Sequence, residues 1–301
     1  MDGWMDGWME GGAGGMPEPQ RVAPVTVRDL VRLSAAGRRL VAVTAYTAPE
    51  ARLCDAAGVD VILVGDSLGN AVLGLADTLG VTMDDMVRHT RAVAGAAQRA
   101  LVVADLPFLS YQTGIADAVR NGGRLLQAGA SAVKLEGGSA YVPTVEALGH
   151  AGIPVIGHLG FTPQSVRRLG GPRVQGRESG SAEELRRDAA ALAAAGVGAI
   201  VLEMVPGPLA QAVTAEVSVP TIGIGAGPDC SGQILVLYDL VGLSPRLPHF
   251  ARSYGDAGAE IGRAVERYAE DVRAGRFPGP EHTHDGRRWG EPHPPGRDAP
   301  S

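Results

Sequence analysis

The sequence predicts a (β/α)8 barrel, a closed ring of parallel strands surrounded by helices. Short apolar runs rich in β-branched residues alternate with helix-length, alanine-rich stretches. The strand runs are continuously apolar, which is typical of strands buried on both faces of a parallel sheet. Seven or eight such units in about 260 residues match the barrel in count and length. An open doubly wound sheet is the alternative, but it usually has fewer strands, and no Gly-x-Gly-x-x-Gly motif opens the first helix.

The expected elements follow one another in regular order. The expected strands are Leu40–Thr44, Val61–Val64, Leu101–Ala104, Ala132–Leu135, Pro154–Gly157, Ala199–Leu202, Pro220–Ile224 and Gln233–Tyr238. The stretches between them carry apolar residues at three- and four-residue spacing, the period of one helix face. The expected helices are Pro49–Gly58, Met83–Gln98, Ala116–Gly129, Val142–Gly152, Ala182–Gly196 and Leu209–Val217.

The alternation predicts a single catalytic domain over residues 21–280, because no linker interrupts it. Residues 1–20 contain an MDGW repeat without the positive and apolar regions of a signal peptide, and we expect a disordered leader. Residues 281–301 are rich in proline, glycine, histidine and charge, and we expect a disordered tail.

Composition excludes several classes of protein. A net charge of −6 without a basic stripe argues against nucleic acid as a partner. No apolar run reaches the roughly 18 uncharged residues of a membrane span. Cys54 and Cys230 are far apart and show no metal-binding or pairing motif, which favours a reducing, cytoplasmic location.

Polar residues gather where the expected strands end, and barrel enzymes place their chemistry there. These residues are Tyr46, Asp66, Ser67, Asp105, Lys134, Glu136, His158 and Glu203. A lone Asp or Ser after a strand is as readily a helix cap. Four carboxylates on one rim beside Lys134, the only lysine among 27 basic residues, favour a functional site instead.

Asp66, Asp105 and Glu136 offer oxygen ligands, which Mg²⁺ prefers to the nitrogen and sulfur ligands of zinc sites. Side chains alternate along a strand, so Lys134 and Glu136 face the same side. A structural ion pair is the alternative for Lys134, although its burial is costly. A divalent ion suits a substrate with adjacent carboxylate and carbonyl groups, whose enolate it stabilises. Glu203 is then the candidate general base.

Two further segments leave alternatives open. The turn Gly223–Gly227 is either a phosphate-binding loop or a tight turn. The segment Thr162–Ser181 lacks periodicity and is long for a barrel loop, which indicates a lid or binding loop, whereas a solvated loop is the commoner meaning of its arginine charges.

A set of motifs resembles the ketopantoate hydroxymethyltransferase family over residues 25–282. The motifs are VTAYT (43–47), LVGDSLG (63–69), TLGVTMDDM (78–86), HT (89–90), ADLPF (104–108), AGASAVKLEGG (128–138), PVIGHLGFTPQSV (154–166), GGPRVQGR (170–177), VLEMVP (201–206), IGIGAG (222–227) and SGQILVLYD (231–239). They occur in one order without large gaps.

The resemblance implies a Mg²⁺-dependent (β/α)8 barrel with one ion per subunit. It implies transfer of a hydroxymethyl group from 5,10-methylenetetrahydrofolate to 3-methyl-2-oxobutanoate, which gives 2-dehydropantoate for pantothenate synthesis. Asp66, Asp105 and Glu136 would hold the metal, while Asp66, Ser67, Asp105 and Lys134 would contact the oxo acid. Glu203 would accept the proton. The family forms homo-oligomers, commonly decamers.

The sequence departs from the family at four positions. The family usually has Asp at Thr47, Pro at Gly80 and Tyr-Lys at Pro172-Arg173. None of the four is an expected metal ligand or the base. The departures therefore bear on folate binding, lid behaviour or turnover rather than on the kind of reaction.

Two other functions compete with this one. A related metal-dependent lyase of the isocitrate-lyase-like barrels would need a cysteine-bearing active-site loop, and neither Cys54 nor Cys230 lies in one. A catalytically inactive barrel kept for binding or assembly would show a broken rim, whereas this rim is complete in sequence.

Overall fold

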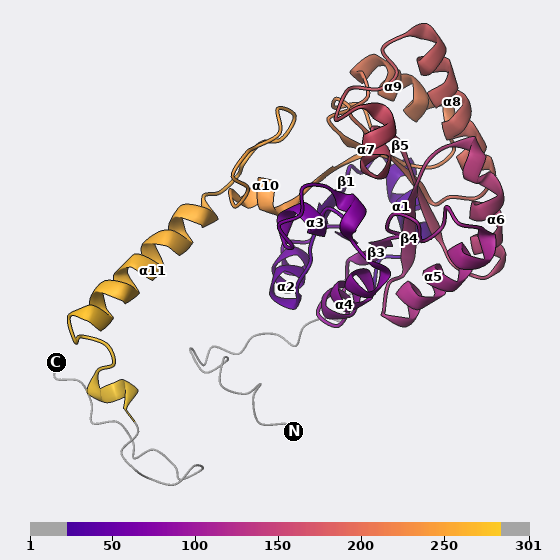
Figure 1. Cartoon of the computed structure of the whole chain (residues 1–301). Coiled ribbons are helices and arrows are strands. Elements are labelled where there is room, and N and C mark those ends of the chain that lie inside the picture. The colour runs from indigo at the N-terminus through magenta and orange to yellow at the C-terminus, as the bar shows by residue number, and fades with distance from the viewer. Residues whose placement is uncertain (1–22, 284–301) are drawn as a thin grey trace. The chain divides into compact units, whose positions relative to one another are not determined.

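A computed structural model describes residues 23–283 and shows the expected barrel (Figure 1). Its parallel strands pair in chain order and close on themselves, with β8 beside β1. They are β1 (Leu40–Thr44), β2 (Val61–Val64), β3 (Leu101–Asp105), β4 (Ala132–Glu136), β5 (Val155–Gly160), β6 (Ala199–Glu203), β7 (Thr221–Ile224) and β8 (Gly232–Leu235). The predicted fold class is confirmed.

The six predicted helices lie between the strands, with ends shifted by a few residues. The described residues contain five further α-helices that were not predicted, one before β1, two short ones between strands and two after β8. The α-helices are α1 (Val27–Ala35), α2 (Ala48–Ala56), α3 (Leu68–Ala71), α4 (Met83–Ala94), α5 (Ile115–Gln127), α6 (Val142–His150), α7 (Val166–Leu169), α8 (Ser179–Ala194), α9 (Gly207–Glu216), α10 (Leu237–Val241) and α11 (Ala257–Arg273). The 3-10 helices are η2 (Thr78–Gly80), η3 (Ser139–Tyr141), η4 (Pro163–Ser165) and η5 (Pro280–His282).

Two expected boundaries are wrong. The last strand ends at Leu235, and α10 follows from Leu237, whereas the sequence predicted a strand through Tyr238. The segment 162–181, expected as an irregular loop, contains η4 and α7, and α8 begins at Ser179. The helices η4, α7 and α10 are each too short for a helical period to stand out in the sequence.

The described residues divide into two compact units where the sequence predicted one domain. The first contains residues 23–237 and 248–251, which include the barrel, and the second contains residues 238–247 and 252–283, which include α11. The expected leader, 1–20, and all but the first three residues of the expected tail, 281–301, lie outside the described residues.

Helix α1 packs against the apolar interior of the barrel. Thr26 caps it, because its hydroxyl accepts from the Asp29 backbone N–H while the Asp29 carboxylate accepts from the Thr26 N–H. Leu30 on this helix is 1% exposed and belongs to a cluster built from alternate residues of the strands. A Cβ on Gly198, which precedes β6, would lie 1.9 Å from Val27, so glycine is required for this approach.

The cap of α2 accounts for one departure from the family. Thr47 is the N-cap residue, and its hydroxyl accepts from the Glu50 N–H while Glu50 accepts from the Thr47 N–H. Threonine and aspartate both cap helices in this way. The exchange therefore preserves the local structure immediately after β1.

We expect Leu30→Ala to lower the free energy of unfolding by about 2–5 kcal/mol, because it leaves a cavity that the closed ring cannot collapse to fill. Urea denaturation followed by circular dichroism measures the change. Leu53→Ala is the control, since Leu53 is 73% exposed on α2 and its truncation should cost no more than about 0.5 kcal/mol. Equal effects of the two substitutions would contradict a supporting role for α1.

Candidate active site

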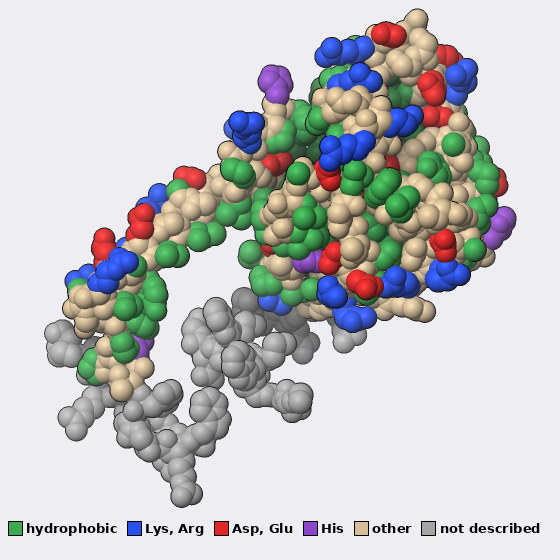
Figure 2. Space-filling view, in the orientation of Figure 1, with side chains coloured by type: hydrophobic (Ala, Val, Ile, Leu, Met, Phe, Trp, Pro, Cys, Tyr) green, Lys and Arg blue, Asp and Glu red, His purple; other side chains and the backbone are tan. Residues whose placement is uncertain are grey.

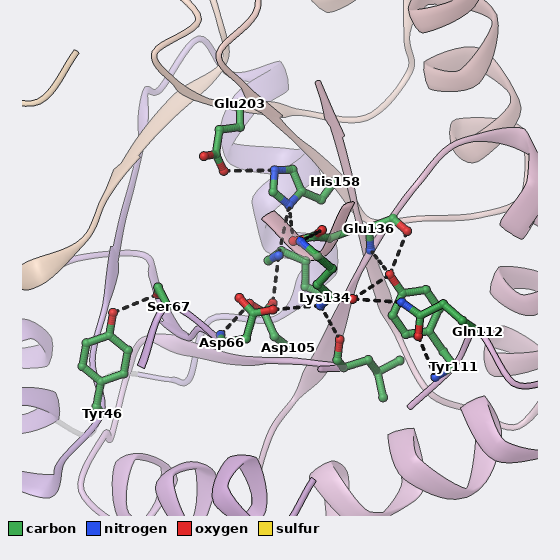
Figure 3. A network of polar contacts seen from close by, with 12 residues as sticks. Tyr46, Asp66, Ser67, Asp105, Tyr111, Gln112, Lys134, Glu136, His158 and Glu203 are labelled. Atoms are coloured by element: carbon green, nitrogen blue, oxygen red, sulfur yellow. Dashed lines mark hydrogen bonds and ion pairs between the residues drawn. The ribbon is translucent and has the colours of Figure 1, made fainter. Parts of the chain in front are cut away.

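A continuous network of polar contacts occupies the carboxyl ends of the strands (Figure 3). Asp105, Glu136 and Glu203 are the last residues of β3, β4 and β6, so each belongs to its strand rather than to the loop after it. Strand pairing sets Asp105 opposite Lys134 and Glu136 opposite His158. The ring closure therefore brings together residues that are far apart in the sequence.

Asp66, Asp105 and Lys134 lie near the middle of this network in Figure 3. Lys134 Nζ lies 3.0 Å from Asp105 Oδ1 in an ion pair whose two side chains are 5% and 3% exposed. Asp105 Oδ2 accepts a hydrogen bond of 3.0 Å from the Asp66 backbone N–H. One carboxylate thus holds both the lysine and the turn that follows β2.

His158 connects the lysine and two glutamates. Its Nδ1 lies 3.2 Å from Lys134 Nζ and 3.5 Å from Glu136 Oε1. Its Nε2, on the other side of the imidazole, lies 3.3 Å from Glu203 Oε2. Glu203 is the most exposed member of this group, with 16% of its side chain accessible.

Ser67 is held from the opposite side of the network. Its Oγ lies 2.9 Å from the hydroxyl of Tyr46, which accepts a hydrogen bond from the Thr44 hydroxyl. Thr44 Oγ1 in turn accepts from the backbone N–H of Leu237, just after β8. The hydroxyl of Ser67 is therefore connected to the β1–β8 closure.

Gln164 joins the network from η4. Its side-chain Nε2 donates to Asp66 Oδ2 at 2.8 Å, and its backbone N–H donates to Glu136 Oε2 at 2.9 Å. The Tyr111 hydroxyl lies 3.1 Å from Gln164 Oε1 and 2.9 Å from the Glu136 carbonyl oxygen, so its one proton is shared between two acceptors. One residue thus contacts two of the three expected metal ligands.

The base of the network has an excess of buried negative charge. Burial, followed by repulsion from Asp105 and Glu136, raises the pKa of Asp66 well above its ordinary value. Burial also raises the pKa of Asp105, although Lys134 acts against it. The surrounding carboxylates, Asp105 first, raise the pKa of Lys134 despite its burial, so the lysine stays charged. Further positive charge would stabilise the ionised carboxylates.

His158 responds to opposing influences. Burial and Lys134 act to lower its pKa, but Glu136 and Glu203 outweigh them and raise it to about 9. Above this pKa, the tautomer protonated at Nε2 leaves Nδ1 free to accept from Lys134. In the protonated imidazolium and in this neutral tautomer alike, a proton on Nε2 faces Glu203.

Unpaired polar atoms concentrate at this site. Among the described residues, the buried side-chain atoms without a hydrogen-bond partner are Thr78 Oγ1, Thr90 Oγ1, Asp105 Oδ1, Glu136 Oε1 and His158 Nε2. Three of them belong to this network, where close ion pairs replace hydrogen bonds. Buried oxygens of this kind suit a hard cation. Nevertheless, no group of three or more His, Cys, Asp or Glu side chains in residues 23–283 is already arranged around a metal position.

The structure brings all the expected site residues, Asp66, Ser67, Asp105, Lys134, Glu136 and Glu203, into this network. Sequence reasoning placed His158 and Tyr46 at strand ends but gave neither a role. It missed Tyr111 and Gln164 altogether. A strand-end position could have indicated His158, whereas Gln164 and Tyr111 lie in irregular segments where no periodicity distinguishes them.

The peptide after Glu203 has a strained conformation. Met204 has φ of 47°, a left-handed value that is uncommon for residues with a side chain. Hydrogen bonds from Phe161 N–H to the Glu203 carbonyl and from Gln175 N–H to the Met204 carbonyl hold it. Gly160 is required beside it, because a Cβ there would lie 2.2 Å from the Glu203 carbonyl oxygen.

The glycine-rich segment after β7 forms a turn in the structure. Gly225 and Gly227 have φ of 62° and 79°. A Cβ on Gly225 would lie 3.0 Å from the ring of Phe250. These conformations explain the glycines without a ligand.

The chain resembles known enzymes over most of its length. A family model described as ketopantoate hydroxymethyltransferase matches residues 24–280. The chain is 56% identical over 261 residues to the 3-methyl-2-oxobutanoate hydroxymethyltransferase of Moorella thermoacetica, covering 86% of this chain and 97% of that protein. It is 59% identical over 240 residues to the enzyme of the same name from Pyrobaculum neutrophilum, covering 80% and 92%.

Solved structures with the same fold are more distant in sequence. A phosphonopyruvate hydrolase complex with oxalate and Mg²⁺ has a TM-score of 0.56 and 18% identity, covering 85% of this chain and 93% of that one. A 2,3-dimethylmalate lyase of the PEP mutase/isocitrate lyase superfamily has a TM-score of 0.56 and 19% identity, covering 86% and 93%. At such identities the likeness shows the barrel fold alone. The matched length and identity of the nearer relatives confirm the predicted family, and the chain belongs to the ketopantoate hydroxymethyltransferases, a family of one-carbon transferases.

Proposed function

We propose that the chain transfers a hydroxymethyl group from 5,10-methylenetetrahydrofolate to 3-methyl-2-oxobutanoate, giving 2-dehydropantoate. The observation that carries the proposal is the placement of Lys134 and three carboxylates at the barrel mouth, with a fourth carboxylate, Glu203, across His158. An α-oxo acid presents two adjacent oxygens, which match a site that binds charge at its base. Its C3 hydrogen would then face the more accessible Glu203.

The carboxylates fit a divalent cation, with Mg²⁺ proposed at one ion per subunit. Asp66, Asp105 and Glu136 would supply the ligands. The buried Asp105 Oδ1 and Glu136 Oε1, which lack a hydrogen-bond partner among the described residues, and the raised pKa values of Asp66 and Asp105 support this assignment. Mg²⁺ usually takes one or two carboxylates together with water and substrate, so a preformed three-residue cage is not required. When bound, such an ion polarises the substrate oxygens and stabilises the enolate.

The chain's own residues perform the remaining steps. Asp66, Ser67, Asp105 and Lys134 bind the oxo acid, with the Lys134 ammonium offsetting its negative charge. The Glu203 carboxylate accepts the proton from C3, and the electron pair left on C3 attacks the methylene carbon of the folate iminium. Water then replaces the folate nitrogen on that carbon, which gives the hydroxymethyl group and releases tetrahydrofolate. His158 positions Glu203, since its Nε2 is 3.3 Å from the Glu203 carboxylate.

We also propose that the protein is a cytoplasmic homo-oligomer. Both cysteines are free thiols, which fits a reducing compartment. Helix α11 carries Ile261, Val265, Tyr268 and Val272 along one side, each at least 45% exposed (Figure 2). A second copy of the chain is the occupant that the family's assembly suggests for this face. None of the helices in residues 23–283 has the length and apolar character of a membrane span.

With Mg²⁺ and without folate, the protein should exchange the C3 hydrogen of 3-methyl-2-oxobutanoate with D₂O, and NMR follows the loss of the signal. Glu203→Gln should slow this exchange by about 10²–10⁴-fold, because the amide cannot accept the proton. Glu146→Gln on the exposed face of α6 is the control and should exchange at the wild-type rate. Unchanged exchange in Glu203→Gln would remove Glu203 as the base. Adding 5,10-methylenetetrahydrofolate should give 2-dehydropantoate, whereas a lyase would cleave an oxo acid instead.

Lys134→Arg should fold normally but lower kcat/KM at least about tenfold, or about 1.4 kcal/mol of transition-state stabilisation. A guanidinium is longer and planar, and it cannot keep Nζ contacts of 3.0 and 3.2 Å in so buried a position. Steady-state kinetics give the comparison. Arg120→Lys at an exposed site is the control. Wild-type kinetics in Lys134→Arg would show that the lysine is not specifically required.

Val265→Glu should reduce the mass measured by light scattering, because it places a charge in the apolar stripe of α11. Arg267→Glu introduces the same residue, with a larger change of charge, on the same helix outside that stripe and should leave the mass unchanged. A wild-type protein that runs as a monomer at micromolar concentration would disprove the proposed assembly.

A further inference from the structure

Gln164 is more completely engaged than its place in an irregular segment suggests. It lies in η4, at the start of the segment that follows β5, and is 5% exposed. Its hydrogen-bonding groups reach three parts of the barrel mouth. The Nε2 amide donates to Asp66 Oδ2 at 2.8 Å and to the Leu106 carbonyl at 2.9 Å.

The other groups of Gln164 are occupied as well. Its Oε1 accepts from the Tyr111 hydroxyl at 3.1 Å and from Gln112 Nε2 at 3.0 Å. Its backbone N–H donates to Glu136 Oε2 at 2.9 Å. Exchanging the amide oxygen and nitrogen would set an oxygen against Asp66 Oδ2 and the Leu106 carbonyl, both acceptors. The pattern of donors and acceptors therefore fixes the orientation of the amide.

We propose that Gln164 is a positioning residue for divalent-cation binding, which it controls by holding one oxygen of Asp66 and one oxygen of Glu136. This inference rests on the proposed metal site. The oxygen of Glu136 that Gln164 does not hold, Oε1, is buried and has no hydrogen-bond partner among the described residues, although it lies 3.5 Å from His158 Nδ1. By occupying Oε2, the backbone N–H of Gln164 leaves Oε1 as the oxygen available to a cation.

A neutral amide suits this role better than a charged group. An arginine or lysine here would neutralise the carboxylates and compete with the cation, whereas an amide orients them and leaves their charge intact. Donor groups that orient metal ligands typically affect metal affinity by about 10- to 100-fold. The side chain of Gln164 holds Asp66, whereas its backbone N–H holds Glu136, so a side-chain substitution removes the contact to Asp66 and keeps the contact to Glu136.

The test measures cation binding rather than turnover. Isothermal titration with MgCl₂ and with MnCl₂ gives the Kd for the wild-type protein and for Gln164→Met, which keeps the side-chain length but removes its donors and acceptor. We expect Kd to rise about 10- to 100-fold in Gln164→Met. Gln98→Met, at an exposed position, is the control and should bind as the wild type does. At saturating Mg²⁺ the kcat of Gln164→Met should come closer to the wild-type value than its activity does at low Mg²⁺.

The outcomes separate this inference from the function on which it rests. If the wild-type protein binds neither ion, the proposed metal site fails. If the wild type binds and Gln164→Met binds equally well, the role of Gln164 is overturned. Should thermal denaturation show that Gln164→Met does not fold, Gln164→Asn takes its place. That variant keeps the amide but is one methylene too short to reach Asp66, and an unchanged Kd would overturn the proposal equally.

Discussion

Uncompensated negative charge in a buried space is the constraint on which the site depends. Asp66, Asp105 and Glu136 are each at most 4% exposed, and one lysine lies among them. Removing such charges from water is costly unless partners repay the cost. The short distances around Lys134, the raised pKa of Asp66 and the Glu136 oxygen without a hydrogen bond all follow from this imbalance. A bound cation would reduce the repulsion among the carboxylates. The charge imbalance that destabilises the free protein would therefore favour cation binding.

The barrel makes this concentration of charge possible through its regularity. Side chains of alternate residues on β4 face the same side, so the strand that buries Ala132 in the interior also directs Lys134 and Glu136 toward the mouth. Pairing with β3 and β5 then sets their neighbours. The apolar interior below holds these side chains in place. The first residue of β4 thus supports the barrel interior, and its later residues form the site.

The sequence predicted much of this because both signals are local. Continuous apolar runs indicated the strands, and a polar residue at the end of a run indicated the rim, which was enough to identify Asp105, Lys134, Glu136 and Glu203. The partners of those residues could not be found in the same way. Gln164 and Tyr111 acquire their roles only from distances across the closed ring, over 98 residues in the case of Gln164 and Asp66. Similarly, α1 packs against the barrel interior ahead of the first strand, where no repeating unit indicates it.

Closure of the ring has a kinetic consequence. The pairing of Leu40 with Gly232 joins segments separated by most of the barrel sequence, and such non-local contacts form slowly. Until β8 arrives, β1 lacks one of its two neighbours and presents an unpaired edge. The hydroxyl chain from Leu237 through Thr44 and Tyr46 to Ser67 is also incomplete before that moment. Recovery of activity during refolding is therefore a reporter of ring closure, distinct from the earlier appearance of helical structure.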